Sequence, residues 1–219
     1  MANEPVEIAL FPLGLVLFPG MVQPLHIFEP RYRDMTRRAL DSAESIGITL
    51  ALPESAFLHE IPARVGTMAR ILDYQRLPDG RYNLLTVGAR RFEILETIRG
   101  ERPYLRGRVR LLPEEPGSGP VEKLAREARL LLDEYLAIVL SDSENGDKGI
   151  VVPADPIELS YFIAVLLPCE DHSKQELLEA SAADERLARE LDLLRVEIAS
   201  AREATAAERA ARHPHAPGA

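Results

Sequence analysis

The sequence predicts an α+β protein in which a strand-rich N-terminal half precedes a helical C-terminal half. The stretch from Val65 to Leu112 is a series of short strand patterns separated by turn residues. Segment 113–120 is crowded with Pro, Gly and Glu, and beyond it the apolar residues recur at the spacing of amphipathic helices. We therefore expect a β-rich domain at 1–116, a helical domain at 117–205 and a disordered tail at 206–219.

The central stretch is predicted to form a four-stranded meander. Phe92 and Ile94 alternate with polar residues, which is the two-residue period of a half-buried strand. Pro78 and Gly80 form a turn, and Gly88 and Gly100 are expected to mark the next two strand boundaries. Four strands with two open edges need a partner layer or closure into a barrel.

The N-terminal segment adds further strands and one helix. Residues 8–11 form a short apolar strand pattern, residues 22–28 are predicted to form another strand, and Pro24 limits the second to an edge or a bulge. Pro30 suits the first position of a helix, where its missing N–H costs nothing. The helical stripe that follows comprises Tyr32, Met35, Ala39 and Ala43.

The helical half contains recognisable helix starts. Asp155 before Pro156 predicts an N-cap, and Ser173 with Glu176 predicts a second capping box. Residues 121–140 form a long amphipathic pattern with Leu124, Ala128, Leu131, Tyr135 and Ile138 on one face. The last helix presents Leu187, Leu191, Leu194 and Ile198.

Composition limits the classes of partner. The net charge of −9 disfavours a nucleic-acid backbone, which is bound by clustered positive charge. The single cysteine, Cys169, cannot form an internal disulfide, which fits a reducing compartment. No apolar run approaches the ~20 residues that span a bilayer. We expect a cytoplasmic protein without a membrane partner.

No catalytic, metal or cofactor site is predicted. His59-Glu60 lacks the second histidine of a zinc-binding H-E-x-x-H helix. Neither the nucleophile elbow G-x-S-x-G nor the phosphate loop G-x-x-x-x-G-K-[ST] is present. Cys169 has no sequence neighbour that would activate it, so we expect a structural thiol.

Three segments resemble the Lon N-terminal domain family, and its free-standing bacterial members in particular. They are LFPLGLVLFPGMVQPLHIFEPRY (10–32), VGTMARILDYQRLPDGRYNLLTVGARRFEIL (65–95) and a helical run that begins ADPIELSYF (154–162). The resemblance covers roughly residues 8–200 in the family's order. It implies a PUA-like, partly open β-barrel followed by a helical bundle. In Lon this module is associated with recognising unfolded or damaged protein, and the sequence has no counterpart of Lon's ATPase or protease.

The resemblance implies a non-catalytic module that binds unfolded or extended polypeptide, as an adaptor for protein quality control, with an ATP-dependent protease in trans as a candidate partner. An RNA-binding PUA-like module is the alternative, and a hydrolase lacks any nucleophile motif. Polar groups at the junction of strand and helix form either the rim of a peptide groove or a helix-start ion pair. The expected peptide site comprises Leu25, His26, Phe28, Glu29, Arg31, Tyr32 and Arg70.

Overall fold

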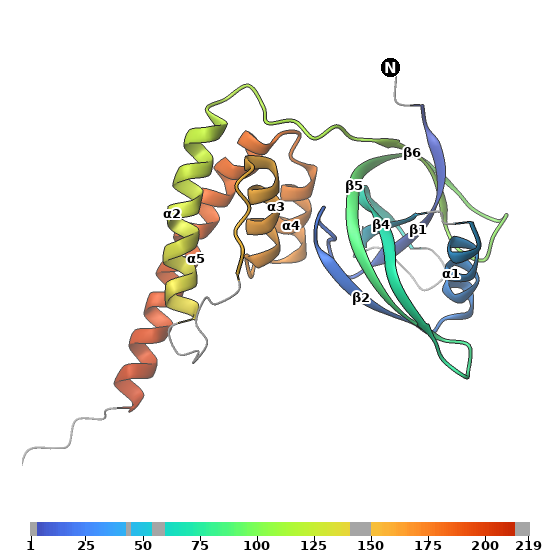
Figure 1. Cartoon of the computed structure of the whole chain (residues 1–219), viewed down its shortest axis with the longest axis horizontal. Helices are drawn as coiled ribbons and strands as arrows, with labels where there is room; N and C mark the ends of the chain where they lie inside the picture. The colour runs from blue at the N-terminus through green and yellow to red at the C-terminus, as the bar shows by residue number, and fades with distance from the viewer. Residues whose placement is uncertain (1–3, 43–44, 54–59, 141–149, 213–219) are drawn as a thin grey trace, which may run out of the picture. The chain divides into compact units, whose positions relative to one another are not determined.

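The computed structural model describes residues 4–42, 45–53, 60–140 and 150–212 (Figure 1). Its contacts divide the chain into two compact units. The first unites Met1–Glu114 with Cys169–Ala180, and the second unites Glu115–Pro168 with Ser181–Ala219. Each unit is described by itself below.

The first unit is built on a six-stranded sheet of order β2-β5-β4-β3-β1-β6. Its strands and helices are β1 (Val6–Leu13), β2 (Val22–Ile27), α1 (Pro30–Ser42), β3 (Ile46–Ala51), β4 (Pro62–Arg76), β5 (Tyr82–Ile98), β6 (Arg106–Leu111) and α4 (Asp171–Glu179). Strands β1 and β3 are parallel, and all other pairs are antiparallel. Strand β6 pairs with both β1 and β5, so the sheet curves back on itself. The result is a partly open barrel and not a closed one. The predicted α+β class and partly open barrel are confirmed.

Strand β2 is an edge of this sheet. Within the described part of the chain it pairs only with β5, in a register that places Pro24 opposite Leu85. Proline cannot donate to a ladder, so an edge strand is where it is tolerated. The prediction from Pro24 is confirmed, and β2 presents a second side that no described strand occupies.

The prediction of four strands between Val65 and Leu112 is wrong, because β5 continues through Gly88 and the stretch holds three strands. A Cβ added at Gly88 would lie 2.1 Å from the carbonyl oxygen of Phe18. The Gly88 carbonyl accepts from the Gly20 N–H and the Gly88 N–H donates to Met21, both at 2.9 Å. This glycine permits a close approach of two backbone segments within a continuous strand. Gly80 and Gly100 do lie in turns, with φ of 81° and 89°.

Arg91 of β5 joins the sheet to α4, although its side chain is only 1% exposed. Its Nη1 donates to the carbonyl oxygens of Leu178 (2.8 Å) and Ala180 (2.6 Å), at the end of α4. Its Nη2 donates to the carbonyl of Pro113 (3.2 Å), and its Nε pairs with the Glu114 carboxylate (3.1 Å). The last carbonyls of a helix have no partner within it and carry partial negative charge, so a buried cation suits them.

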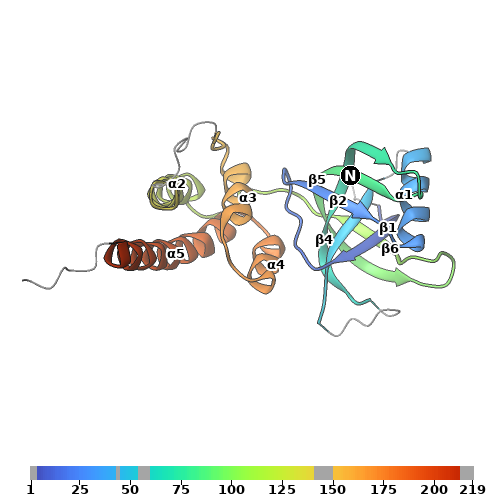
Figure 2. The same ribbon diagram turned by 90° about the horizontal axis from the view of Figure 1, so that it is seen from below.

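The second unit consists of α2 (Val121–Val139), α3 (Pro156–Leu166) and α5 (Ala183–Arg212), with α2 and α5 side by side (Figures 1 and 2). The predicted cap of α3 is confirmed: Asp155 Oδ1 accepts from the N–H groups of Ile157 (2.9 Å) and Glu158 (3.0 Å). No helix among the described residues is both long and apolar enough to cross a bilayer.

Two helix ends differ from prediction. The capping box at Ser173 is wrong, because α4 already begins at Asp171, whose charge favours the first turn. The stripe on α5 is buried as predicted, but the helix continues to Arg212, past residue 205. Ala, Arg and Glu dominate this extension, and all three favour helix. Residues 213–219 of the expected tail, and Ala43, lie outside the described residues.

A buried carboxyl group lies on α5. Glu190 is 0% exposed, and neither carboxyl oxygen has a hydrogen-bond partner among the described residues. Arg186 is buried as well; its guanidinium lies 3.8 Å from the centre of the Tyr161 ring, and its Nε donates to Ser160 Oγ (2.8 Å). Burial raises the pKa of Glu190 well above its ordinary value, although the positive charge of Arg186 opposes the shift.

Arg91→Ala is expected to lower the free energy of unfolding by about 3–5 kcal/mol, because it leaves buried carbonyl groups and Glu114 without their cation. Arg90→Ala, at the exposed neighbouring position on β5, should stay within about 0.5 kcal/mol of wild type. Urea denaturation followed by circular dichroism measures both. Equal effects of the two substitutions would contradict the anchoring role of Arg91.

Glu190 should make stability depend on pH. Its raised pKa means that the folded state favours the protonated carboxyl, so this stabilisation is complete below the ordinary value of 4.5 and is lost as the pH rises toward the raised pKa. Across that window the loss amounts to about 1.4 kcal/mol per pH unit. Glu190→Gln should remove this slope from denaturation curves, whereas Glu203→Gln, at an exposed position on α5, should leave it unchanged.

Candidate functional site

A hollow lies at the junction where β2 passes into α1. Its volume is about 270 Å³. The lining residues come from β1, the end of β2, the start of α1 and one distant glutamate: Phe11, Pro12, Leu13, Leu25, His26, Ile27, Phe28, Glu29, Tyr32 and Glu60. We call this hollow the junction pocket. Most of its lining is apolar, and it adjoins the edge strand β2.

The start of α1 positions Tyr32 in the floor of the junction pocket. Pro30 occupies the first helical position, as predicted, and the Glu29 carbonyl accepts the N–H of Tyr32 at 3.1 Å. The Tyr32 ring packs on Phe11, with ring centres 4.3 Å apart. The Tyr32 hydroxyl donates to Glu60 Oε2 at 2.6 Å. Burial and the neighbouring Glu60 both raise the pKa of Tyr32, so the hydroxyl stays protonated and remains a donor.

Arg31 completes a polar network at the rim. Its two terminal nitrogens donate to both oxygens of Glu60 (3.1 and 2.8 Å), and its Nε donates to Glu29 (2.9 Å). The guanidinium carbon lies 4.4 Å from the centre of the Tyr32 ring. Burial disfavours the charged form, but hydrogen bonding to Glu29 and the charge of Glu60 raise the pKa of Arg31 above its ordinary value. The cation is therefore held in one orientation by two carboxylates.

The other side of the rim is more open. His26 Nδ1 lies 2.7 Å from Asn83 Oδ1, across the β2–β5 pair, and its Nε2 lies 3.3 Å from Arg81 Nη1. The Phe28 ring stacks loosely on His26 at 6.2 Å, and 59% of the residue is exposed. A large exposed aromatic beside an apolar hollow is a typical contact residue.

This arrangement suits binding. It combines an apolar floor, a fixed charged rim and an edge strand whose backbone can pair with another chain. In the ranges that the structure describes, no group of three or more His, Cys, Asp and Glu side chains is placed to hold a metal ion.

The structure brings together most of the residues expected at the site. Five of them line the junction pocket: Leu25, His26, Phe28, Glu29 and Tyr32. Arg31 does not line the pocket itself, but it forms ion pairs with Glu29 and Glu60, which do. The ion pair expected at the start of the helix is therefore present as well. Arg70 does not line it; this exposed residue lies on β4 opposite Val87.

Sequence reasoning missed Glu60 and Phe11. Glu60 lies 29 positions from Arg31 in the sequence, and no local pattern connects the two. In the sequence it stands out only as part of an incomplete metal motif, His59-Glu60. Phe11 belongs to an apolar strand pattern. That pattern predicts that its side chain is buried, but not which residues it contacts.

Glu60→Ala should destabilise the protein by about 1.5–3 kcal/mol, because it removes the acceptor of a buried hydroxyl and of a partly buried guanidinium. Glu96→Ala breaks only the exposed pair with Arg108 and should cost at most about 1 kcal/mol. Chemical denaturation of both variants tests whether the hydrogen bonds and ion pairs of Glu60 at the rim stabilise the folded protein. A cost for Glu60→Ala no larger than that for Glu96→Ala would argue against it.

Comparison with known proteins places this architecture among Lon domains. A family model described as the ATP-dependent protease La (LON) substrate-binding domain matches residues 7–196. The Lon protease of Brevibacillus choshinensis is 30% identical over 188 residues, which cover 83% of this chain and 24% of that protein. The Lon protease of Heliobacterium modesticaldum is 31% identical over 204 residues, which cover 87% and 25%. The chain thus spans about a quarter of the length of these relatives.

Two solved structures share the fold. The crystal structure of a Lon N-terminal domain protein from Xanthomonas campestris has a TM-score of 0.64 and 28% identity, and the match covers 85% of this chain and 98% of that one. The N-terminal domain of the Mycobacterium avium complex Lon protease has a TM-score of 0.69 at 21% identity, covering 86% and 98%. The fold that the family resemblance implied is confirmed.

Proposed function

The chain belongs to the Lon substrate-binding domain family, and we propose that it is a non-catalytic module that captures unfolded or extended segments of other proteins. The family itself supports a substrate-binding role. The extended form of the ligand, the absence of catalysis and the location of the site are inferred from the junction pocket and β2.

The observation that carries the proposal is an apolar pocket next to the edge of β2 that no described strand occupies. An extended peptide can pair its backbone with β2, as in other cases of β-augmentation. At about 270 Å³ the junction pocket is slightly smaller than the ~300–1,000 Å³ typical of small-molecule sites. It fits one large apolar side chain, whose ring or branch would contact Phe28 and Tyr32.

We further propose that the module acts as an adaptor for protein quality control. Its relatives are ATP-dependent proteases that extend well beyond the matched domain. A captured segment would be passed to an ATP-dependent protease acting in trans. The single cysteine fits a cytoplasmic setting for this task.

Fluorescence anisotropy with a labelled pool of unfolded casein peptides tests the proposal. Phe28→Ala should weaken binding by about tenfold, because exposed aromatic anchors carry much of the energy of such contacts. Leu130→Ala removes another exposed apolar side chain, 71% exposed on α2, and should leave the affinity unchanged. Binding should also persist at high salt, since buried apolar contacts are not screened.

Two results would contradict the proposal. Peptide affinity that is the same in wild type and Phe28→Ala would remove the junction pocket from the site. Salt-sensitive binding of a labelled RNA without any peptide signal would favour the alternative RNA-binding module.

A further inference from the structure

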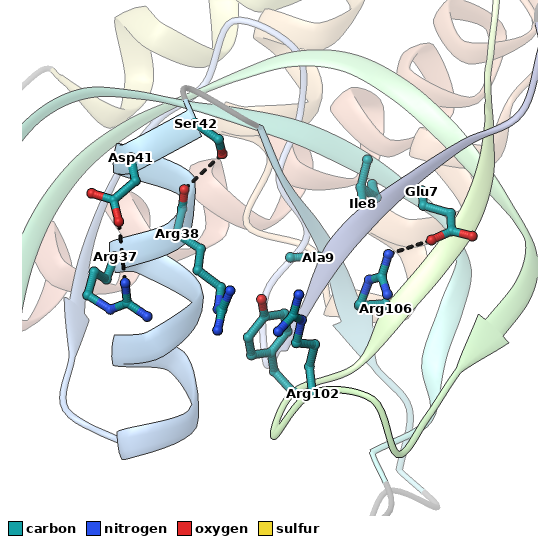
Figure 3. A pocket seen from close by; sticks show the side chains of 10 residues that line it. Glu7, Ile8, Ala9, Arg37, Arg38, Asp41, Ser42, Arg102 and Arg106 are labelled. Carbon is teal, nitrogen blue, oxygen red and sulfur yellow. Dashed lines mark hydrogen bonds and ion pairs between the residues drawn. The ribbon is translucent and has the colours of Figure 1, made fainter.

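A second and larger pocket lies in the strand-rich unit, between β1, the end of α1 and the segment that leads into β6 (Figure 3). Its volume is about 380 Å³, which is within the ~300–1,000 Å³ typical of small-molecule sites. Its lining is Glu7, Ile8, Ala9, Arg37, Arg38, Asp41, Ser42, Arg102, Tyr104 and Arg106. We call it the arginine pocket, because four of these residues are arginines.

Three of the four arginines form ion pairs, and two of these three are each paired with two carboxylates. Arg37 pairs with Asp41 (3.3 Å) and with Asp34 (2.6 Å), both on its own helix. Arg106 pairs with Glu7 and with Glu101. These ion pairs shape the wall of the pocket and leave little charge for a ligand.

The remaining two arginines are differently placed. Arg38 uses its Nε for Asp34 (2.9 Å), and its two terminal nitrogens have no hydrogen-bond partner among the described residues. The Arg102 guanidinium has no partner there either. Figure 3 shows both side chains extending toward the middle of the pocket from opposite sides. Two like charges that share a small space repel each other unless an anion lies between them.

Tyr104 adds a neutral donor to this pair. The residue is buried in the main apolar core of the unit and also lines the arginine pocket. Its hydroxyl makes no hydrogen bond to any described residue. One hydroxyl donor and two guanidinium forks in the lining of one pocket suit a tetrahedral oxyanion, because each fork can hold two oxygens at once.

We propose that the arginine pocket binds a small, multiply charged oxyanion of the phosphate type between Arg38 and Arg102. A long nucleic acid fits the pocket less well. Glu7 and Asp41 lie in its wall, and the chain carries a net charge of −9. Tyr104, the aromatic residue in the lining, is buried, so no ring is offered for base stacking. This site is separate from the proposed peptide site and does not depend on it.

Isothermal titration calorimetry of the full chain with inorganic pyrophosphate, at constant ionic strength, tests the proposal. Wild type should bind one pyrophosphate per chain. Arg102→Ala and Arg38→Ala should each weaken the affinity by at least about tenfold, the loss typical of one charge-assisted contact. Arg102→Lys keeps the charge but not the fork, and should fall between wild type and Arg102→Ala.

Arg108→Ala is the matched control. Arg108 lies on β6, is exposed, pairs with Glu96 and does not line the pocket, so its loss should not change the affinity. Arg102 is exposed, so its variants should unfold at the wild-type temperature without ligand. Pyrophosphate should raise that temperature for wild type and not for Arg102→Ala.

Three results would overturn the proposal. They are the absence of pyrophosphate binding at millimolar concentration, equal weakening by Arg102→Ala and Arg108→Ala, and Arg102-dependent binding of an RNA oligonucleotide tighter than that of pyrophosphate. The last result would assign the pocket to nucleic acid.

Discussion

The strand-rich unit depends on one buried cation. A guanidinium stays charged at any physiological pH, so the almost complete burial of Arg91 is tolerable only because backbone carbonyls and Glu114 surround it. These partners belong to two stretches of chain, the exit from β6 and the end of α4. The position of both relative to β5 is therefore set by the donor geometry of a single side chain. An apolar residue at the same place would fill the space without selecting those partners.

Arginine performs three distinct tasks in this unit, and its partners distinguish them. Arg91 is enclosed by carbonyls and is structural. Arg31 is held by two carboxylates, so it orients the rim of the junction pocket while Phe28 stays free for contact. Arg38 and Arg102 face a pocket with donors to spare. Each of these tasks uses the planar fork of donors, which a lysine side chain lacks.

Sequence reasoning succeeded where the signal is local. Pro24 identified the edge strand, Asp155 identified a helix start, and the residues around Tyr32 were found because they are contiguous in the chain. It failed where tertiary contacts decide. Alternation places Arg91 on the face opposite Phe92 and allows a bridge to the helices, but it names none of the partners of Arg91, and Glu60 reaches the site from a distant segment. On α2 the predicted Ala128 and Tyr135 are buried, but Leu124 and Leu131 are only half-buried, and Ala125 and Leu132 are buried instead. Helix α2 packs against both α3 and α5. Its buried face is therefore set by two neighbouring helices and differs from the face that the apolar spacing alone predicts.

The path of the chain between the two units has an implication for dissecting the protein. The chain leaves the strand-rich unit after Glu114, returns for Cys169–Ala180, and leaves again at Ser181. A fragment that ends near the Pro- and Gly-rich linker would lose α4 and, with it, the Leu178 and Ala180 carbonyls that accept from Arg91. No single cut yields both units intact. Recombination that joins domains end to end would therefore have to transfer the two units together, as one gene segment.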